Sequence, residues 1–220
     1  MNQSVVLRPM MLVILTAIGL GVMSSSCSSS ADTPLPPGSL PPAEEDAVFG
    51  LSWEYTEEEL ISGGVIKGKP EPFRGQAGRM YAPARLPRAF EDATWYALFF
   101  NDAGELLRIA CVGDTVKDDP EGIAIRKRYE ELKGIISRKI PIVGTYEESQ
   151  EAWARPQSWW SSIKDGKAHW ATGFRGELME AVLEIRAESD AAGSYSLIVD
   201  HLPRMQQLNQ AADDREKSAF

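Results

Sequence analysis

The sequence predicts an α+β domain in which helices cover one face of an antiparallel β-sheet. Three observations predict this class: two apolar runs flank a turn at 101–104, apolar residues recur with helical spacing over 123–139, and three strand-like segments follow. Strands joined by short turns pair antiparallel, and an amphipathic helix needs an apolar surface to cover, so the helices are expected on the sheet. The helix-then-strands layout occurs twice, which leaves open that the domain consists of two similar helix-plus-sheet halves.

The first half is expected to begin with a short helix. Thr56 with Glu59 three residues later is the capping-box pattern, and a Gly-Gly pair ends the helix. The stretch 67–88 is rich in Pro, Gly and Arg and predicts a loop around a short strand near Met80. The segment 93–114 predicts a β-hairpin, because the turn sequence Asn-Asp-Ala-Gly stands between two apolar runs.

The second half is expected to begin with a longer helix over 123–139, which Pro141 ends. A shorter helix is expected over 147–154. Three strands are then expected, over 168–174, 179–188 and 194–201. Residues 204–220 are polar and predict a fraying tail with some helical character.

The N-terminus has the organisation of a secretory signal. Residues 1–9 are polar with one positive charge, and Met10–Met23 are 14 uncharged, mostly apolar residues. A helix of that length extends about 21 Å at ~1.5 Å per residue, short of the ~30 Å hydrocarbon core of a bilayer. Residues 1–26 are therefore predicted to be a signal peptide, with an uncleaved anchor as the alternative.

A cysteine stands directly behind this apolar run, in the sequence GVMSSSCSSS. Over residues 1–27 the chain resembles bacterial lipoprotein precursors, which are cleaved before a cysteine that carries diacylglycerol. The resemblance implies lipidation of Cys27, and Ser28 after it favours the outer membrane over the inner one. Ser24 departs from the family pattern, which has an apolar residue at that position. Without lipidation, cleavage near Ser26 or Ala31 implies a secreted or periplasmic protein.

Residues 27–46 are rich in Ser and then in Pro, with almost no large apolar side chain. Such a segment cannot bury enough apolar surface to fold, and its prolines favour an extended backbone. It is predicted to be a disordered tether that reaches about 60 Å at ~3.3 Å per residue. The tether would hold a globular domain of residues 47–203 away from a membrane.

The charge and composition disfavour several classes of ligand. A formal net charge of −9 argues against nucleic acid and against electrostatic binding to anionic lipid. The sequence GGVIKGKP resembles a phosphate-binding loop only superficially, because Pro70 replaces the required Ser or Thr. Neither a nucleotide nor any other cofactor is expected, and two cysteines and two histidines predict no metal site. The acidic residues near Asp119 are interpreted as a solvated turn that starts the next helix.

No catalytic residue is predicted. Asp200 and His201 are adjacent, and neighbours in a strand point to opposite faces. No G-x-S-x-G motif is present. Cys111 lies within an apolar run and is expected to be a small buried residue.

The most distinctive stretch is WARPQSWWSSIKDGKAHW, which contains four of the six tryptophans among basic residues. These aromatic residues either pack in the core and at its rim or form an exposed surface that stacks on sugars or anchors a partner protein. In an extended segment adjacent side chains point to opposite sides, so one of the neighbouring tryptophans is expected to be exposed. The candidate binding surface consists of Trp153, Trp159, Trp160 and Trp170.

These features predict a non-catalytic lipoprotein of the bacterial cell envelope that is anchored through Cys27 and binds an envelope protein or glycan. One alternative is a periplasmic inhibitor such as an immunity protein, since an acidic surface suits a basic partner. The other is a hydrolase whose site is not visible in the sequence.

Overall fold

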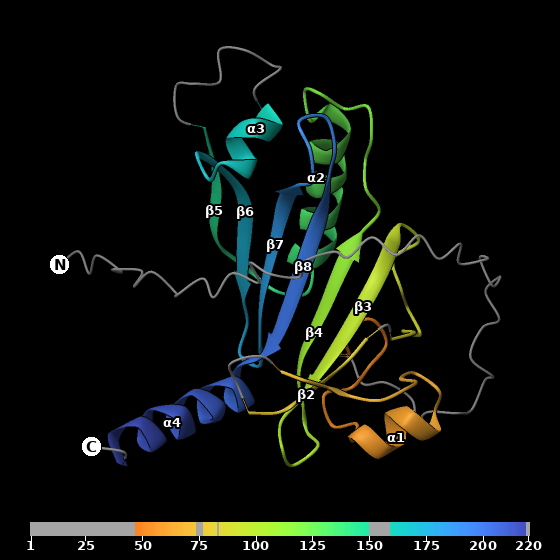
Figure 1. Cartoon of the computed structure of the whole chain (residues 1–220), viewed down its shortest axis with the longest axis vertical. Coiled ribbons are helices and arrows are strands. Elements are labelled where there is room, and N and C mark those ends of the chain that lie inside the picture. Colours follow the sequence, from red (N-terminus) through yellow and green to blue (C-terminus); the bar gives the residue numbers. More distant parts are fainter. Residues whose placement is uncertain (1–46, 74–76, 83, 150–158, 219–220) are drawn as a thin grey trace. The chain divides into compact units, whose positions relative to one another are not determined.

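The computed structural model describes residues 47–73, 77–82, 84–149 and 159–218. The first elements along the chain are α1 (Glu57–Ser62), β1 (Glu71–Pro72), β2 (Arg79–Tyr81), β3 (Ala93–Phe100) and β4 (Leu106–Gly113). They are followed by α2 (Ile123–Ser137), β5 (Ile142–Ser149), α3 (Trp159–Lys164), β6 (Ala168–Arg175), β7 (Met179–Ala187), β8 (Gly193–His201) and α4 (Leu202–Ser218). Within the described residues the strands form one antiparallel sheet (Figure 1), which confirms the α+β prediction.

The strand order across the sheet is β1-β2-β3-β4-β8-β7-β6-β5. Two runs of four consecutive strands therefore meet at their last members, β4 and β8, which pair from Arg108 with Asp200 to Val112 with Ser196. Each run is preceded by a helix, α1 or α2. The expected helix-plus-strands layout thus occurs twice, but the two sets of strands share one continuous sheet.

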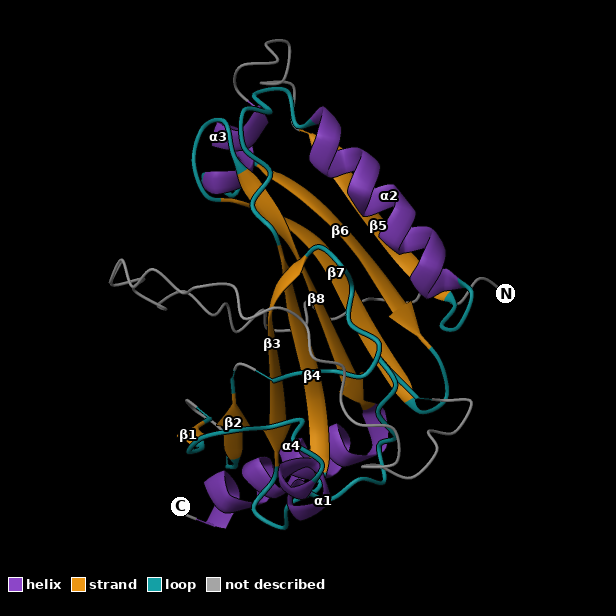
Figure 2. Ribbon diagram, turned by 90° about the vertical axis from the view of Figure 1, so that its right-hand side faces the viewer, coloured by secondary structure: helices purple, strands orange, loops and turns teal. Residues whose placement is uncertain are grey.

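The main core lies on one face of the sheet, where α2 covers part of it (Figure 2) and buried side chains from the segments 51–66 and 84–86 join the same cluster. The helix contributes four buried side chains: Ile125, Tyr129, Leu132 and Ile136. Their spacing of three and four residues places them on one side of the helix. Each such buried side chain contributes about 1.5–3 kcal/mol through removal of apolar surface from water. The Tyr129 hydroxyl is hydrogen-bonded to the Thr172 hydroxyl on β6 at 2.6 Å, so the polar group that it carries into the core is satisfied.

The short-range predictions hold in the first half. Thr56 caps α1 with both bonds of the capping box, since its side chain accepts from the Glu59 amide and the Glu59 carboxylate accepts from the Thr56 amide. The hairpin is formed by β3 and β4, and Gly104 in its turn has a positive φ of 80° that glycine adopts without strain.

The helix predicted over 147–154 is wrong. Residues 147–149 form the end of β5, and residues 150–154 lie outside the described residues. Ile142, Val143 and Thr145 are β-branched and favour a strand. Pairing with β6 extends that strand to Ser149, so the pairing overrides the local helical tendency of the glutamates.

The C-terminal segment is more ordered than a polar tail. Residues Leu202–Ser218 form α4, which starts directly after β8. Leu202 and Met205 are buried, and the Arg204 guanidinium donates hydrogen bonds to the carbonyl oxygens of Trp53 and Leu106. These contacts fix the first turn of the helix.

The predicted signal peptide, Cys27 and the tether all lie outside the described residues. Among the helices that the structure does describe, none combines the length and the apolar character needed to cross a membrane.

Candidate functional site

The four tryptophans of the candidate surface do not lie together on the outside. Trp159 and Trp160 in α3 are buried, with exposed fractions of 1% and 0%. Trp170 on β6 is half-buried, and Trp153 lies outside the described residues. The expectation that one of the adjacent pair is exposed is wrong, because these residues are helical. Neighbours on a helix are about 100° apart at 3.6 residues per turn, so both rings fit beneath one helix.

Trp159 and Trp160 pack against each other in the core. The Trp159 and Trp160 rings meet edge to face at 4.5 Å, and the Trp160 Nε1 donates to the Asp119 carbonyl oxygen. Two glycines leave room for the rings: a Cβ on Gly122 would lie 2.2 Å from the Trp159 ring, and a Cβ on Gly193 would lie 2.1 Å from the Trp160 ring. For these two residues the core interpretation is confirmed.

Asp119 starts α2, as expected, but it is itself buried, whereas a solvated turn was predicted. Its carboxylate accepts hydrogen bonds from the backbone amides of Ile123, Ala124 and Ile125 at 2.8–3.1 Å. Gly122 at the N-cap has no side chain with which to cap the helix, so Asp119 takes that role. The free amides that begin any helix are thereby satisfied from within the chain.

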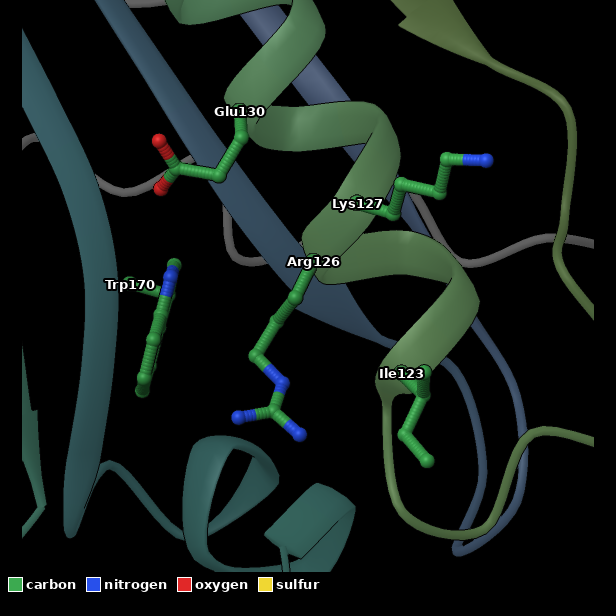
Figure 3. A pocket seen from close by; sticks show the side chains of 5 residues that line it. All are labelled: Ile123, Arg126, Lys127, Glu130 and Trp170. Carbon is green, nitrogen blue, oxygen red and sulfur yellow. The ribbon is translucent and has the colours of Figure 1, made fainter.

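Beside this helix start lies a groove of about 300 Å³ between α2 and β6 (Figure 3). It is lined by Trp170 from β6 and by four residues from α2: Ile123, Arg126, Lys127 and Glu130. The α2 residues recur at steps of three or four, so they lie along one side of the helix. The groove therefore depends on the packing of α2 against β6, two elements that are distant in the sequence.

Arg126 is held in position in the groove. Its guanidinium carbon lies 5.5 Å from the centre of the Trp159 ring and 5.7 Å from that of Trp170, within the range of cation–π attraction. Its Nε donates to the Gly122 carbonyl oxygen and its Nη2 to the Glu121 carbonyl oxygen. The buried Trp159 thus supports a cation that faces the groove.

The groove has an excess of positive charge. Glu130 and Glu147 on β5 share the single charge of Lys133, at 2.7 Å and 2.6 Å. Partial burial opposes the lysine charge, but the hydrogen bonds to both carboxylates raise the pKa of Lys133. Among the described residues, neither Arg126 nor Lys127 forms an ion pair with a carboxylate. Two cations are therefore available in a chain whose net charge is −9.

Apolar and aromatic surface accompanies these charges. The Ile123 side chain is 59% exposed at the rim of the groove, and Trp170 forms the opposite wall. A concave surface with an indole, an aliphatic side chain and a few charged groups has the composition of a ligand site. The sequence indicated Trp170 but not Arg126 and Lys127. In the sequence these two residues are ordinary charged positions on a predicted helix, and nothing distinguishes them from the others.

The histidines and Cys111 lie elsewhere. His169 is exposed on β6, whereas His201 is buried beside Trp53. Cys111 is a buried free thiol, as predicted, and burial raises its pKa to about 12. In the described part of the chain, no three His, Cys, Asp or Glu side chains are grouped so as to hold a metal ion.

None of the protein-family models, curated proteins or solved structures compared with this chain matches it.

Proposed function

We propose that this protein is a non-catalytic, lipid-anchored component of a bacterial cell envelope whose domain binds another envelope component in the groove between α2 and β6. The observation that carries the binding role is the half-buried Trp170 facing the fixed Arg126 guanidinium across a concave surface. The anchoring role is supported by the short apolar run of Met10–Met23, by Cys27 behind it and by the Ser/Pro-rich tether.

The groove favours a ligand that combines an anionic group with a flat or apolar surface. Arg126 and Lys127 supply the positive charge, and Trp170 and Ile123 supply the apolar surface. Glycans with carboxylate groups have this combination, since the apolar face of a sugar ring stacks on an indole. An acidic, aromatic segment of an envelope protein has it as well, so the ligand is either a glycan or a protein.

The binding role is tested with insoluble peptidoglycan and the detergent-extracted full-length chain. Lys127 is exposed, so Lys127→Glu reverses a charge of the groove without disturbing the core. We expect it to weaken co-sedimentation about ten-fold, equivalent to ~1.4 kcal/mol. Lys69→Glu is the matched control, because Lys69 is also exposed but lies between α1 and β1. It should bind as the wild type does.

A photo-crosslinking residue at position 123 tests the protein alternative in intact cells. A specific adduct that Lys127→Glu abolishes, together with no retention on peptidoglycan, would identify a protein ligand. If neither assay detects an interaction that depends on Lys127, the groove is not a binding site.

The anchor is tested separately with a Cys27→Ala variant and a fatty acid analogue that can be detected after metabolic incorporation. We expect the variant to lose both the incorporated label and its retention in the membrane fraction. An unchanged membrane location and an unchanged gel mobility would show that Cys27 carries no lipid.

A further inference from the structure

The two edges of the sheet are protected very differently. One edge is β1, which has only two residues, one of them Pro72 and the other the exposed Glu71. A short strand with a proline and a charge is a poor template for another strand. The other edge is β5, which has eight residues and pairs with β6 on one side. No described strand pairs with its outer side.

Strand β5 also exposes apolar side chains. Three of the seven exposed large hydrophobic residues in the described part of the chain lie on it: Ile142, Val143 and Tyr146, at 45%, 57% and 48% exposure. A long edge strand with this much exposed apolar surface is expected to have a partner. The unpaired backbone groups along the edge specify the kind of partner, since amides and carbonyls spaced along a strand are satisfied by another strand.

Two of these side chains share the sheet face opposite α2. Thr145 points toward the helix side, because its hydroxyl accepts a hydrogen bond from Thr172, which itself contacts Tyr129 of α2. Tyr146, next along the strand, therefore points away from α2. Val143 lies in a bulge, and its Cγ2 would be 3.7 Å from a Cβ on Gly173 of β6. Val143 and Tyr146 therefore stand on either side of Gly144 at the sheet edge.

The charges around β5 favour a second copy of the chain as the partner. Arg138 and Lys139 precede the strand, and Glu147 lies near its other end, where it and Glu130 share the single charge of Lys133, so that this end keeps a negative charge. Antiparallel pairing of two copies about a two-fold axis near Gly144 brings the basic end of each copy to the acidic end of the other. Parallel pairing would instead place like charges side by side, which is unfavourable.

We propose that two copies associate through antiparallel pairing of their β5 strands, so that the sheets join into one. Such an interface is isologous, with the same strand contributed by both partners. The pairing satisfies the outer backbone groups of β5 and covers the side chains of Val143 and Tyr146. It does not involve the groove between α2 and β6, so it holds or fails independently of the proposed binding function.

Disulfide trapping in membranes that contain the full-length chain tests this pairing. A cysteine at position 144 fits the fold, because a Cβ there meets only the Tyr146 ring, at 3.7 Å. We expect Gly144→Cys to give a covalent dimer on mild oxidation. Glu71→Cys, at the opposite edge of the sheet, is the matched control and should give at least ten-fold less dimer.

Charge substitution gives a second measurement on the same surface. Val143→Lys should abolish the trapped dimer and convert the detergent-extracted protein to a monomer in sedimentation velocity, with its circular dichroism spectrum unchanged. Leu178→Lys is the control, because Leu178 is 43% exposed in the turn between β6 and β7, and should leave the dimer intact. Equal trapping at positions 144 and 71, a dimer that survives Val143→Lys, or adducts with a different protein would each overturn the proposal.

Discussion

Arg128 on α2 forms a bidentate salt bridge with Asp92, the residue before β3: its Nε and Nη2 each lie 2.6 Å from a carboxylate oxygen. Asp92 also accepts a hydrogen bond from the Tyr195 hydroxyl of β8 at 3.0 Å. One carboxylate thereby connects the helix, the start of the hairpin and the last strand of the sheet. Bidentate pairs of this kind add geometric specificity as well as energy.

We predict that Asp92→Asn lowers the free energy of unfolding by about 1–2 kcal/mol at neutral pH, since both ion-pair partners are only partly buried. Burial opposes ionisation of this carboxyl, but the hydrogen bonds from Arg128 and Tyr195 lower the pKa of Asp92. A lowered folded-state pKa contributes stability above the unfolded-state pKa and loses it as the pH falls. In urea titrations, the difference between the two proteins should therefore be constant at neutral pH and shrink below about pH 4. A difference that is independent of pH would show that the charge of Asp92 is not responsible.

We predict that buried His201 makes the domain sensitive to mild acid. Its ring centroid lies 5.3 Å from that of Trp53, and burial, assisted by the nearby Arg204 charge, lowers the pKa of His201. Glu54 and Glu105 act in the opposite direction. The unfolded chain therefore binds the proton more readily than the folded one. The free energy of unfolding is highest above the unfolded-state pKa of about 6.5 and decreases as the pH drops below it.

His201→Asn should reduce this decline between neutral and mildly acidic pH, although it also lowers stability at neutral pH through lost packing. His169→Asn is the control, since His169 is exposed, and should leave the decline as it is in the wild type. Thermal unfolding of both variants and of the wild type, followed across the pH range, measures this decline. An identical decline in the wild type and His201→Asn would refute the assignment.

We predict that Gly193→Ala destabilises the domain by about 1–3 kcal/mol, the range for overpacking a filled core. A Cβ at this position would lie 2.1 Å from the Trp160 ring and 2.3 Å from the Arg186 carbonyl oxygen, so both ring and backbone must move. Gly134→Ala on α2 is the matched control, because a Cβ there meets nothing within 4 Å. It should stabilise the helix by about 0.5–1 kcal/mol. Chemical unfolding followed by tryptophan fluorescence distinguishes the two, and equal effects would contradict the packing described for Trp160.

We predict that Cys111 does not react with thiol reagents in the folded protein. The thiol is 1% exposed, and burial raises its pKa to about 12, so the reactive thiolate is scarce near neutral pH. In a Cys27→Ala background, iodoacetamide labelling at pH 8 should become rapid only after denaturant is added. Fast labelling of the native protein would show that β4 opens readily.

The short-range features of the fold were predictable because nearby residues determine them. The capping box of Thr56 and Glu59 and the turn of the β3–β4 hairpin lie where the sequence indicates. The helical repeat of α2 and the three later strands agree with the structure to within two residues at each end. The cap and the turn depend on residues a few positions apart, and the repeats of α2 and the strands record which side of one element is apolar. Each of these patterns is complete within its own segment.

The features that failed involve partners elsewhere in the chain. Residues 147–149 form a strand because β6 supplies backbone partners for β5. Trp159 and Trp160 are both buried because Gly122 and Gly193, distant in sequence, leave space for their rings. The helical character of the tail was expected, but the contacts of Arg204 with Trp53 and Leu106, which fix its first turn, depend on residues distant in the sequence.

The sequence by itself determined the fold class and the positions of most strands and helices, because these depend on local composition and periodicity. The expectation of a lipid anchor at Cys27 came instead from the resemblance of residues 1–27 to bacterial lipoprotein precursors. The tertiary structure alone decided that Arg126 faces Trp170 in a groove and that β5 is an apolar sheet edge. The groove depends on which elements lie side by side, and the edge depends on which strand is outermost in the sheet. That order follows from the packing of the whole domain, and no single segment records it.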